Sequence, residues 1–418
     1  MSILYFNKSK IFYIILSIIT KITMEYTFRW FGPKDPSKLN HIKQIGVSGI
    51  VTSLAEIKYG EKWSYKEINK RKKLIEKNII SKNVNLKWSV VESLPVHNDI
   101  KKRSGRYKYF IDQYKDSLVN LSKSNIKTIC YNFMPLIDWV RTDLNFKLPN
   151  GSLALKYNHL HLCAFENFIL KSKNAKLRYS SKQIFDARKI LNSMNTKDLS
   201  KLRMALLGGL AANDKKYSIK DLNYEIDQFS ELNHDDLRNN LREFINDIYP
   251  IIKKYKLNYN IHPDDPPYNV YGLPRILSNE KDIEYLINIK KDKQIGLTFC
   301  SGSLGVNKKN DLPKIIRKYG SYINFIHLRN IRHVGKSLDF YEDDHLEGNL
   351  NMVEIIKAII NEEKKRKNSN HLIKNIPMRP DHGHTILHDI NNKTIPGYSL
   401  LGRMKGLDQL KGIIKTII

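Results

Sequence analysis

The sequence predicts an α/β protein built as a closed (β/α)8 barrel of the TIM type, with a helical insertion after the fourth strand. From residue 24 onward, short apolar runs alternate with helix-like stretches, which is the pattern of buried parallel strands joined by crossover helices. There are eight such runs, the number that a TIM barrel requires. Four runs in the second half each end at a residue that can bind a metal, and the strand ends of a barrel share one face.

The expected elements follow the chain in order. The helices between the first strands are expected at 36–44, 65–82 and 107–124, and Asp35 is expected to cap the first because Pro36 suits a first helical position. A last amphipathic helix is expected around 407–418. The expected strands are 26–31, 49–53, 86–92, 128–134, 257–261, 295–299, 323–326 and 376–380.

Two stretches interrupt the strand and helix period. The longer insertion, about 139–232, follows the fourth strand and has helical character at 159–171, 181–193 and 196–207. A second, polar stretch at 330–350 follows the seventh strand. Long segments of this kind in a compact domain usually serve function. We therefore expect one catalytic domain over 24–418, with both stretches at the rim of the active face.

The first 23 residues differ from the rest. Lys8 and Lys10 precede an apolar run at 11–19 that resembles part of a signal peptide, but no small-residue cleavage site follows. The run is also short for a membrane span. We interpret 1–23 as an upstream extension, with an over-long start as its simplest origin, and keep a targeting segment as the alternative.

The composition is strongly basic, with 71 Lys+Arg against 42 Asp+Glu and a net charge of +29. The lysines are spread over the predicted helices, without an arginine-rich arm or zinc finger, so we expect neither a nucleic-acid nor a membrane partner. A positive field would still steer an anionic sugar acid towards a cleft. The three cysteines, Cys130, Cys163 and Cys300, lie far apart, which fits a reducing compartment and a cytoplasmic location.

The candidate metal ligands are the residues that follow four strands: His262, Cys300, His327 and Asp381. Two imidazoles, a thiolate and a carboxylate form a suitable first shell for a divalent transition metal. A single buried histidine or cysteine is usually a packed core residue. Four at equivalent ends of successive units predict a metal site at the mouth of the barrel.

Further polar residues lie at the same strand ends. His382 follows Asp381 and cannot share its direction on a strand, so it suits an acid or base beside the metal better than a further ligand. The predicted substrate contacts are Arg29 and Arg329 for a carboxylate, Glu92 and Asn132 for hydroxyls, and His384. Isomerisation, epimerisation, elimination of water and metal-assisted hydrolysis all remain open for such a site.

Ten longer motifs closely resemble those of the D-mannonate dehydratase family, in order, from Met24 to the C-terminus. They are TFRWFG at 27–32, WSVVES at 88–93, CYNFMP at 130–135, DWVRTD at 138–143, IHPDDPP at 261–267, GLPR at 272–275, LTFC at 297–300, HLR at 327–329, MRPDHGH at 378–384 and PGY at 396–398. The first 23 residues, the high lysine content and the stretches 330–350 and 364–374 depart from the family pattern.

The resemblance implies a xylose-isomerase-like TIM barrel that dehydrates D-mannonate to 2-dehydro-3-deoxy-D-gluconate in hexuronate (glucuronate) catabolism. It implies Mn2+ or Fe2+ as cofactor, held by His262, Cys300, His327 and Asp381, and it places the catalytic histidine and tyrosine at His382 and Tyr398. It also favours a homo-oligomer, a dimer or larger. The alternative function is a metal-dependent sugar isomerase or epimerase on the same barrel.

Overall fold

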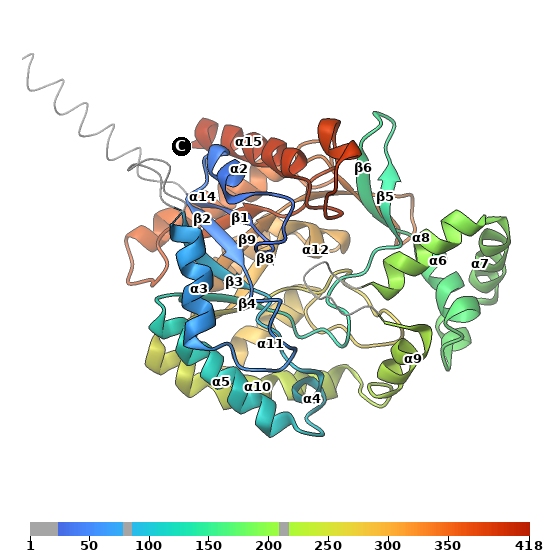
Figure 1. Cartoon of the computed structure of the whole chain (residues 1–418), viewed down its shortest axis with the longest axis horizontal. Coiled ribbons are helices and arrows are strands. Elements are labelled where there is room, and N and C mark those ends of the chain that lie inside the picture. Colours follow the sequence, from blue (N-terminus) through green and yellow to red (C-terminus); the bar gives the residue numbers. More distant parts are fainter. Residues whose placement is uncertain (1–23, 78–85, 209–216) are drawn as a thin grey trace, which may run out of the picture.

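A closed barrel of eight parallel strands forms the centre of the computed structural model, which describes residues 24–77, 86–208 and 217–418 (Figure 1). The strands are β1 (Glu25–Arg29), β2 (Gly49–Thr52), β3 (Lys87–Glu92), β4 (Thr128–Tyr131), β7 (Asn258–Ile261), β8 (Ile295–Cys300), β9 (Ile323–Leu328) and β12 (Pro377–Pro380). They follow one another around the barrel in chain order, and β12 closes it against β1. All eight predicted strands are therefore confirmed.

The register of the strands sets which strand ends are neighbours. Cys300 pairs with His327 between β8 and β9, and His327 pairs with Arg379 between β9 and β12. Glu92 pairs with Cys130 between β3 and β4. Because parallel strands present their carboxyl ends on one face, this register brings the polar ends together at one mouth of the barrel.

Buried apolar side chains hold the barrel from both sides. Inside it, Val51, Val90, Cys130 and Phe325 form a small cluster that fills the space between the strands. Outside it, the helices pack on the strands through one large apolar cluster. These helices are α2 (Leu39–Gln44), α3 (Tyr65–Glu76), α4 (Asn98–Lys102), α5 (Tyr107–Lys123), α10 (His234–Tyr255), α11 (Glu280–Asn288), α12 (Ser301–Val306), α13 (Leu312–Tyr319), α14 (Met352–Lys367) and α15 (Leu400–Ile417).

The helix ends correct two sequence expectations. Asp35 does not cap α2, because its carboxylate accepts hydrogen bonds from the backbone N–H groups of Phe31 and Ser37, both at 2.7 Å, and α2 begins only at Leu39. The last helix begins at Leu400, earlier than predicted, where Ser399 accepts from the Gly402 N–H at 3.0 Å. For the helix expected at 65–82, the part after residue 77 lies outside the described residues.

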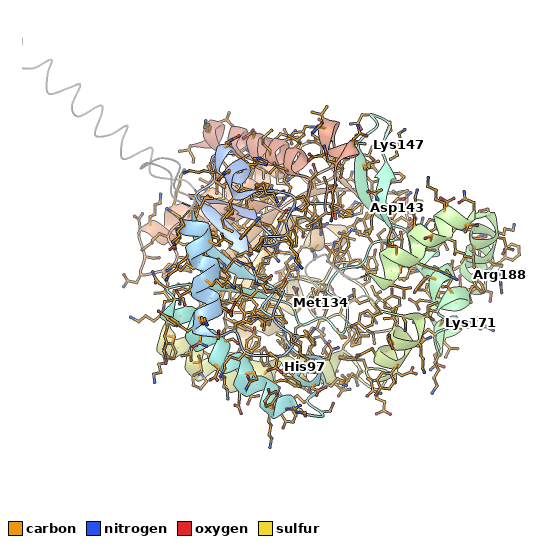
Figure 2. All side chains as sticks on the ribbon, viewed as in Figure 1. His97, Met134, Asp143, Lys147, Lys171 and Arg188 are labelled. Atoms are coloured by element: carbon orange, nitrogen blue, oxygen red, sulfur yellow. The ribbon has the colours of Figure 1, made fainter. Side chains whose placement is uncertain are left out.

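The insertion after β4 combines a hairpin with a group of helices. The predicted helices at 181–193 and 196–207 are confirmed as α7 (Ser181–Ser193) and α8 (Thr196–Leu207). The hairpin of β5 (Asp143–Lys147) and β6 (Leu153–Tyr157) was not predicted. The other helices are α6 (His159–Ala164), continued by a π-helical turn (Phe165–Ile169), and α9 (Ile219–Asp227). Figure 2 shows Lys171 and Arg188 at the outer edge of the molecule and Met134, just after β4, near its centre.

A second, four-stranded antiparallel sheet joins the two interruptions of the barrel. Its order is β10-β11-β6-β5, in which β10 (Asn330–His333) and β11 (Phe340–Asp343) come from the stretch after β9. Phe340 of β11 pairs with Tyr157 of β6. We call it the accessory sheet. The polar stretch 330–350 is thus an ordered part of the rim.

The remaining elements are short. Single turns of 3-10 helix lie at Ala175–Arg178, Gly320–Tyr322 and Leu387–Asn391. Among the described residues, the structure contains no helix with the length and apolarity needed to span a membrane. The extension predicted at 1–23 lies outside the described residues.

Gly402, near the start of α15, allows this helix to lie directly against the segment after β12. A side chain at Gly402 would meet the backbone of His384. We expect Gly402→Ala to destabilise the fold by about 2 kcal/mol, because backbone atoms on both sides must move apart. The urea midpoint of unfolding measures this loss.

Gly412 offers a matched control in the same helix. A Cβ there would have no heavy atom within 4 Å. Gly412→Ala should therefore stabilise the protein slightly, by about 0.5–1 kcal/mol, because alanine favours the helix over glycine. Equal midpoints for the two variants would contradict the close packing of α15.

Candidate functional site

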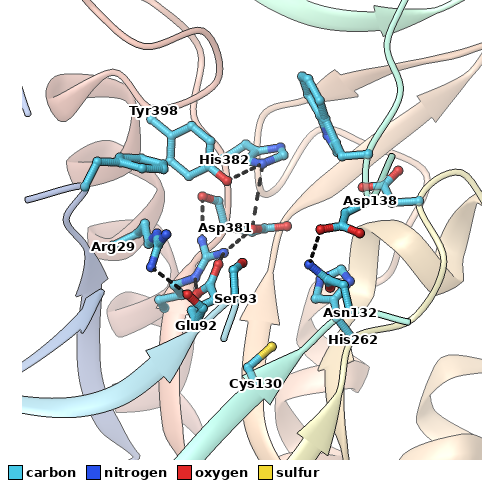
Figure 3. Close-up of a pocket in the computed structure, with 14 residues that line it drawn as sticks. Arg29, Glu92, Ser93, Cys130, Asn132, Asp138, His262, Asp381, His382 and Tyr398 are labelled. Carbon is cyan, nitrogen blue, oxygen red and sulfur yellow. Dashed lines mark hydrogen bonds and ion pairs between the residues drawn. The ribbon is translucent and has the colours of Figure 1, made fainter. Parts of the chain in front are cut away.

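A pocket opens at the carboxyl ends of the barrel strands (Figure 3). Its empty space is about 500 Å³, which includes some open solvent at the mouth. Its lining combines charged, polar and aromatic side chains from several strand ends. These are Arg29, Phe31, Glu92, Ser93, Cys130, Asn132, Asp138, Trp139, His262, Asp265, Arg379, Asp381, His382 and Tyr398.

Three of the predicted metal ligands lie together at this mouth. The donor atoms of His262, Cys300 and His327 all lie within 4.8 Å of one another. The closest pair is His262 Nε2 and His327 Nδ1, at 3.2 Å. His262 directly follows β7, Cys300 ends β8 and His327 is the last residue but one of β9, so the neighbouring strands bring them together as the sequence predicts.

Asp381, the fourth predicted ligand, lies beside this group. Its Oδ2 is 3.4 Å from Cys300 Sγ, and its Oδ1 is 3.7 Å from His327 Nδ1. Arg379 and Arg329 hold the same carboxylate at 2.8 and 2.9 Å. The structure therefore brings all four residues together, with Asp381 also engaged in ion pairs.

The surroundings of the two histidines are compatible with a bound metal ion. His262 Nδ1 lies 2.7 Å from the Pro263 carbonyl oxygen, which can only accept, so Nδ1 carries the proton and Nε2 has a free lone pair. His327 Nε2 lies 3.5 Å from Glu92 Oε2, and this nitrogen has no hydrogen-bond partner within the described part of the chain. When Nε2 carries the proton, His327 Nδ1 presents a lone pair to His262 Nε2, 3.2 Å away. Two lone pairs that face each other repel unless a cation lies between the donors.

Buried arginines and carboxylates surround the pocket in a continuous ion-pair network. Arg379 binds both oxygens of Glu92, at 2.8 and 2.9 Å, and also contacts Asp381. On the other side, Arg141 binds both oxygens of Asp265, at 2.7 and 3.1 Å. The bidentate geometry of these two ion pairs fixes the position of each guanidinium against its carboxylate.

The network keeps its carboxylates ionised. Burial by itself would raise the pKa of Asp381, but His382 and the nearby arginines hold that pKa well below its usual range. Burial would likewise raise the pKa of Glu92, and Arg379 above all holds it well below its usual value. Both groups therefore remain negative at neutral pH and balance the arginines around them.

His382 and Tyr398 form a pair at the edge of the pocket. His382 Nε2 lies 3.1 Å from the Tyr398 hydroxyl, and its Nδ1 lies 2.7 Å from Glu342 Oε2. Burial raises the pKa of Tyr398, so its hydroxyl stays protonated. A backbone bridge between Gly383 and Tyr398 brings the two segments together.

The predicted substrate contacts divide into two groups. Arg29, Glu92 and Asn132 line the pocket, and Asn132 also donates to Asp138 Oδ2 at 3.0 Å. Arg329 and His384 are not among the described residues that line the pocket. The guanidinium of Arg329 binds Asp265 and Glu342, and His384 Nε2 lies 2.9 Å from the Glu342 backbone oxygen. Both residues thus contact other members of the site, and their predicted contact with substrate stays a prediction.

The sequence analysis missed four members of the network: Arg379, Asp265, Arg141 and Glu342. Arg379 has a recognisable signal, because a charged residue inside a short buried strand needs a partner. Asp265 and Arg141 stand within the quoted motifs without an assigned role. Glu342 comes from the accessory sheet, which no local pattern predicted.

Comparison with known proteins decides the family. The sequence model of the D-mannonate dehydratase family matches residues 24–418. The chain belongs to this family. It is 43% identical, over 390 residues, to the mannonate dehydratase of Marinomonas sp. (strain MWYL1), covering 93% of this chain and 98% of that protein.

Solved structures agree with the family. The mannonate dehydratase of Streptococcus suis superimposes with a TM-score of 0.72 at 28% identity, covering 94% of this chain and 93% of that one. A 3-keto-D-glucoside 4-epimerase from E. coli shares the fold, with a TM-score of 0.50 at 11% identity, covering 93% of this chain and 100% of that one. The xylose-isomerase-like TIM barrel is confirmed.

Membership in the family gives the activity. The chain is a hydro-lyase with mannonate dehydratase activity, as its motifs predict, and this decides against the alternative of a sugar isomerase or epimerase. The three donors His262, Cys300 and His327 form a possible metal site, as predicted.

The depressed pKa of Glu92 predicts a pH-dependent contribution to stability. A carboxyl group whose pKa is lower in the folded than in the unfolded chain stabilises the fold. This contribution is complete at a pH above the pKa of the unfolded chain, which is 4.5 for glutamate. It is lost as the pH falls through the pKa of the folded protein. Glu92→Gln should lower stability at pH 7 by about 3 kcal/mol, since it removes one partner of a buried pair. Below about pH 4.5 the variant should then lose stability less steeply than the wild type, by up to about 1.4 kcal/mol per pH unit.

Urea unfolding at pH 7, 5, 4 and 3 measures both effects. Asp235→Asn is the control, because the Asp235 side chain is 85% exposed and its removal should leave the slope unchanged. Parallel pH profiles for the wild type and Glu92→Gln would show that Glu92 is not held ionised by the network.

Proposed function

We propose that this pocket converts D-mannonate to 2-dehydro-3-deoxy-D-gluconate with a divalent metal, as a step of hexuronate catabolism in the cytoplasm. The supporting observation is one mouth of the barrel that holds three metal donors within 4.8 Å of one another, beside the hydrogen-bonded pair His382 and Tyr398. We further propose a homo-oligomer, a dimer or larger, which the family resemblance favours.

The proposed ligands are His262, Cys300, His327 and Asp381, and the proposed ion is Mn2+ or Fe2+. The lone pair of His262 Nε2, the His327 Nδ1 atom 3.2 Å from it, and the nearby thiol and carboxylate support this set. The same shell would also accept Zn2+. When bound, a divalent cation stabilises the negative charge that develops next to the substrate carboxylate.

Arg29 is the proposed partner of the substrate carboxylate. It is fully buried, and it donates to two neutral acceptors, the Glu92 backbone oxygen at 3.3 Å and the Ser53 hydroxyl at 3.2 Å. Its guanidinium therefore retains capacity for an anionic ligand. Asn132 and Glu92, on the pocket wall, are the proposed contacts of the substrate hydroxyls.

The proton transfers are assigned to His382 and Tyr398. Because the Nδ1–H group of His382 donates a hydrogen bond to Glu342, Nε2 has a lone pair and accepts the proton from C2 of the substrate. The Tyr398 hydroxyl gives its proton to the departing 3-hydroxyl, which leaves as water. The resulting enol rearranges to the 2-keto acid.

The contact between the two residues also restores the site. After one turnover, His382 holds one additional proton and Tyr398 lacks one. The 3.1 Å separation of His382 Nε2 and the Tyr398 oxygen allows that proton to pass directly between them. Both groups then return to their starting states without a proton from solvent.

The experiment that tests this function follows 2-keto acid formation from D-mannonate with added Mn2+, using protein expressed from Met24. His382→Asn should abolish turnover, about a thousandfold or more, and should leave the metal content unchanged, because the variant removes the base and no ligand. The control is His234→Asn, on the exposed start of α10, which should remain fully active. Substantial activity in His382→Asn would reject the assigned role.

Cys300→Ser should act on the metal itself. A hydroxyl is a poorer ligand than a thiolate, so the variant should bind at least about tenfold less metal after dialysis. The matched control is Cys163→Ser, because Cys163 is buried in the insertion away from the pocket. Metal analysis of both proteins gives the answer, and a full complement in Cys300→Ser would remove this residue from the ligand set.

A further inference from the structure

Glu342 contacts His382 from outside the barrel. It lies on β11 of the accessory sheet, is 4% exposed, and places Oε2 2.7 Å from His382 Nδ1. Within the described residues it is absent from the pocket lining, so it reaches the substrate only through His382. We propose that Glu342 is a positioning residue that fixes the orientation and tautomer of His382, and that the accessory sheet delivers it. This inference rests on the proposed role of His382.

The chemistry of the contact fixes the tautomer. An ionised carboxylate can only accept hydrogen bonds. Burial would raise the pKa of Glu342, but His382, Arg329 and Arg141 hold that pKa below its usual range, so the group is ionised. His382 Nδ1 must therefore carry the proton. Nε2 then keeps a lone pair, as the proposed base requires, and lies 3.1 Å from the Tyr398 hydroxyl.

Glu342 is itself held at its other oxygen. Arg141 donates to Oε1 from Nε and NH2, at 3.2 and 2.7 Å, and Arg329 forms an ion pair with the same oxygen. Arg141 comes from the insertion and Arg329 follows β9, so two separate parts of the chain fix this carboxylate. Oε1 therefore binds the two arginines, and Oε2 binds His382.

The accessory sheet also holds the segment around His382. His384 Nε2 lies 2.9 Å from the Glu342 backbone oxygen. Leu153 of β6 exchanges two backbone hydrogen bonds with Thr385, at 3.0 and 2.8 Å. The imidazole and the carboxylate that orients it are thus aligned by the same sheet.

If Glu342 were only a counter-charge to the arginines, the tautomer of His382 would not depend on it. The positioning role predicts instead that Glu342→Gln changes this tautomer. In a Glu342→Gln variant the two arginines keep the amide oxygen on their side, because they can only donate. The amide NH2 then faces His382 Nδ1, which must accept, and the proton moves to Nε2. The base is thereby blocked without loss of volume.

We expect Glu342→Gln to lower kcat about 100- to 10,000-fold, by analogy with the loss of the orienting aspartate in serine proteases, while KM and metal content stay within about twofold. Asp343→Asn is the matched control: it removes a carboxylate from the same strand, but one that binds Arg332 at 2.6 Å. It should retain near wild-type kcat. A kcat within about threefold of wild type in Glu342→Gln, or equal losses in both variants, would overturn the proposal.

A second measurement avoids the variant and holds even if Glu342→Gln fails to fold. In zinc-loaded wild-type protein labelled with 15N-histidine, the His382 signals are assigned by their loss in His382→Asn. We expect the proton on Nδ1, and a proton on Nε2 alone would overturn the proposal. If His382→Asn stays active, the proposed function fails; if it is inactive and Glu342→Gln keeps its kcat, only the positioning role fails.

Discussion

A buried network in which arginines and carboxylates alternate is the constraint on which the rest of the site depends. A buried charge without a partner costs several kcal/mol, so each member requires its neighbours to be in place. The network runs from the start of the barrel to the accessory sheet and connects parts that lie far apart in sequence. Glu92, Arg379, Asp381 and Arg329 follow one another in contact, Arg329 pairs with both Glu342 and Asp265, and both of these pair with Arg141. Arg29 joins this chain through the backbone oxygen of Glu92.

The network explains how residues from so many elements keep one geometry. Asp381 is held by Arg379 and Arg329, and so it cannot turn away from Cys300 and His327. Loops tolerate change and move more than strands, and Arg141 lies on such a connection. It is fixed because both of its carboxylate partners are themselves fixed. The ion pairs thus extend the rigidity of the barrel to its rim.

The barrel and the donor set could be predicted from sequence because each depends on local signals. A buried strand leaves a short apolar run, and a donor such as His262 or Cys300 stands directly after it, so fold topology alone places the donors together. Glu342 could not be predicted in this way. Its partner His382 is 40 residues away, and β11 joins the accessory sheet by pairing with β6, about 180 residues earlier, as well as with its neighbour β10. Asp35 shows the same limit at short range, since its side chain bonds two backbone groups before α2 instead of capping it.

The balance of charge connects the network to the substrate. Its four arginines and four carboxylates cancel, and Asp138 on the pocket wall lies 3.9 Å from Lys101, so these charges around the site sum to zero. The proposed divalent cation and the thiolate of Cys300 would add one net positive charge. A sugar acid brings one negative charge, and its carboxylate therefore neutralises the filled site. A neutral sugar of similar shape would leave that charge uncompensated in a buried pocket, which is unfavourable. The same arrangement that stabilises the walls thus selects for a monoanionic substrate.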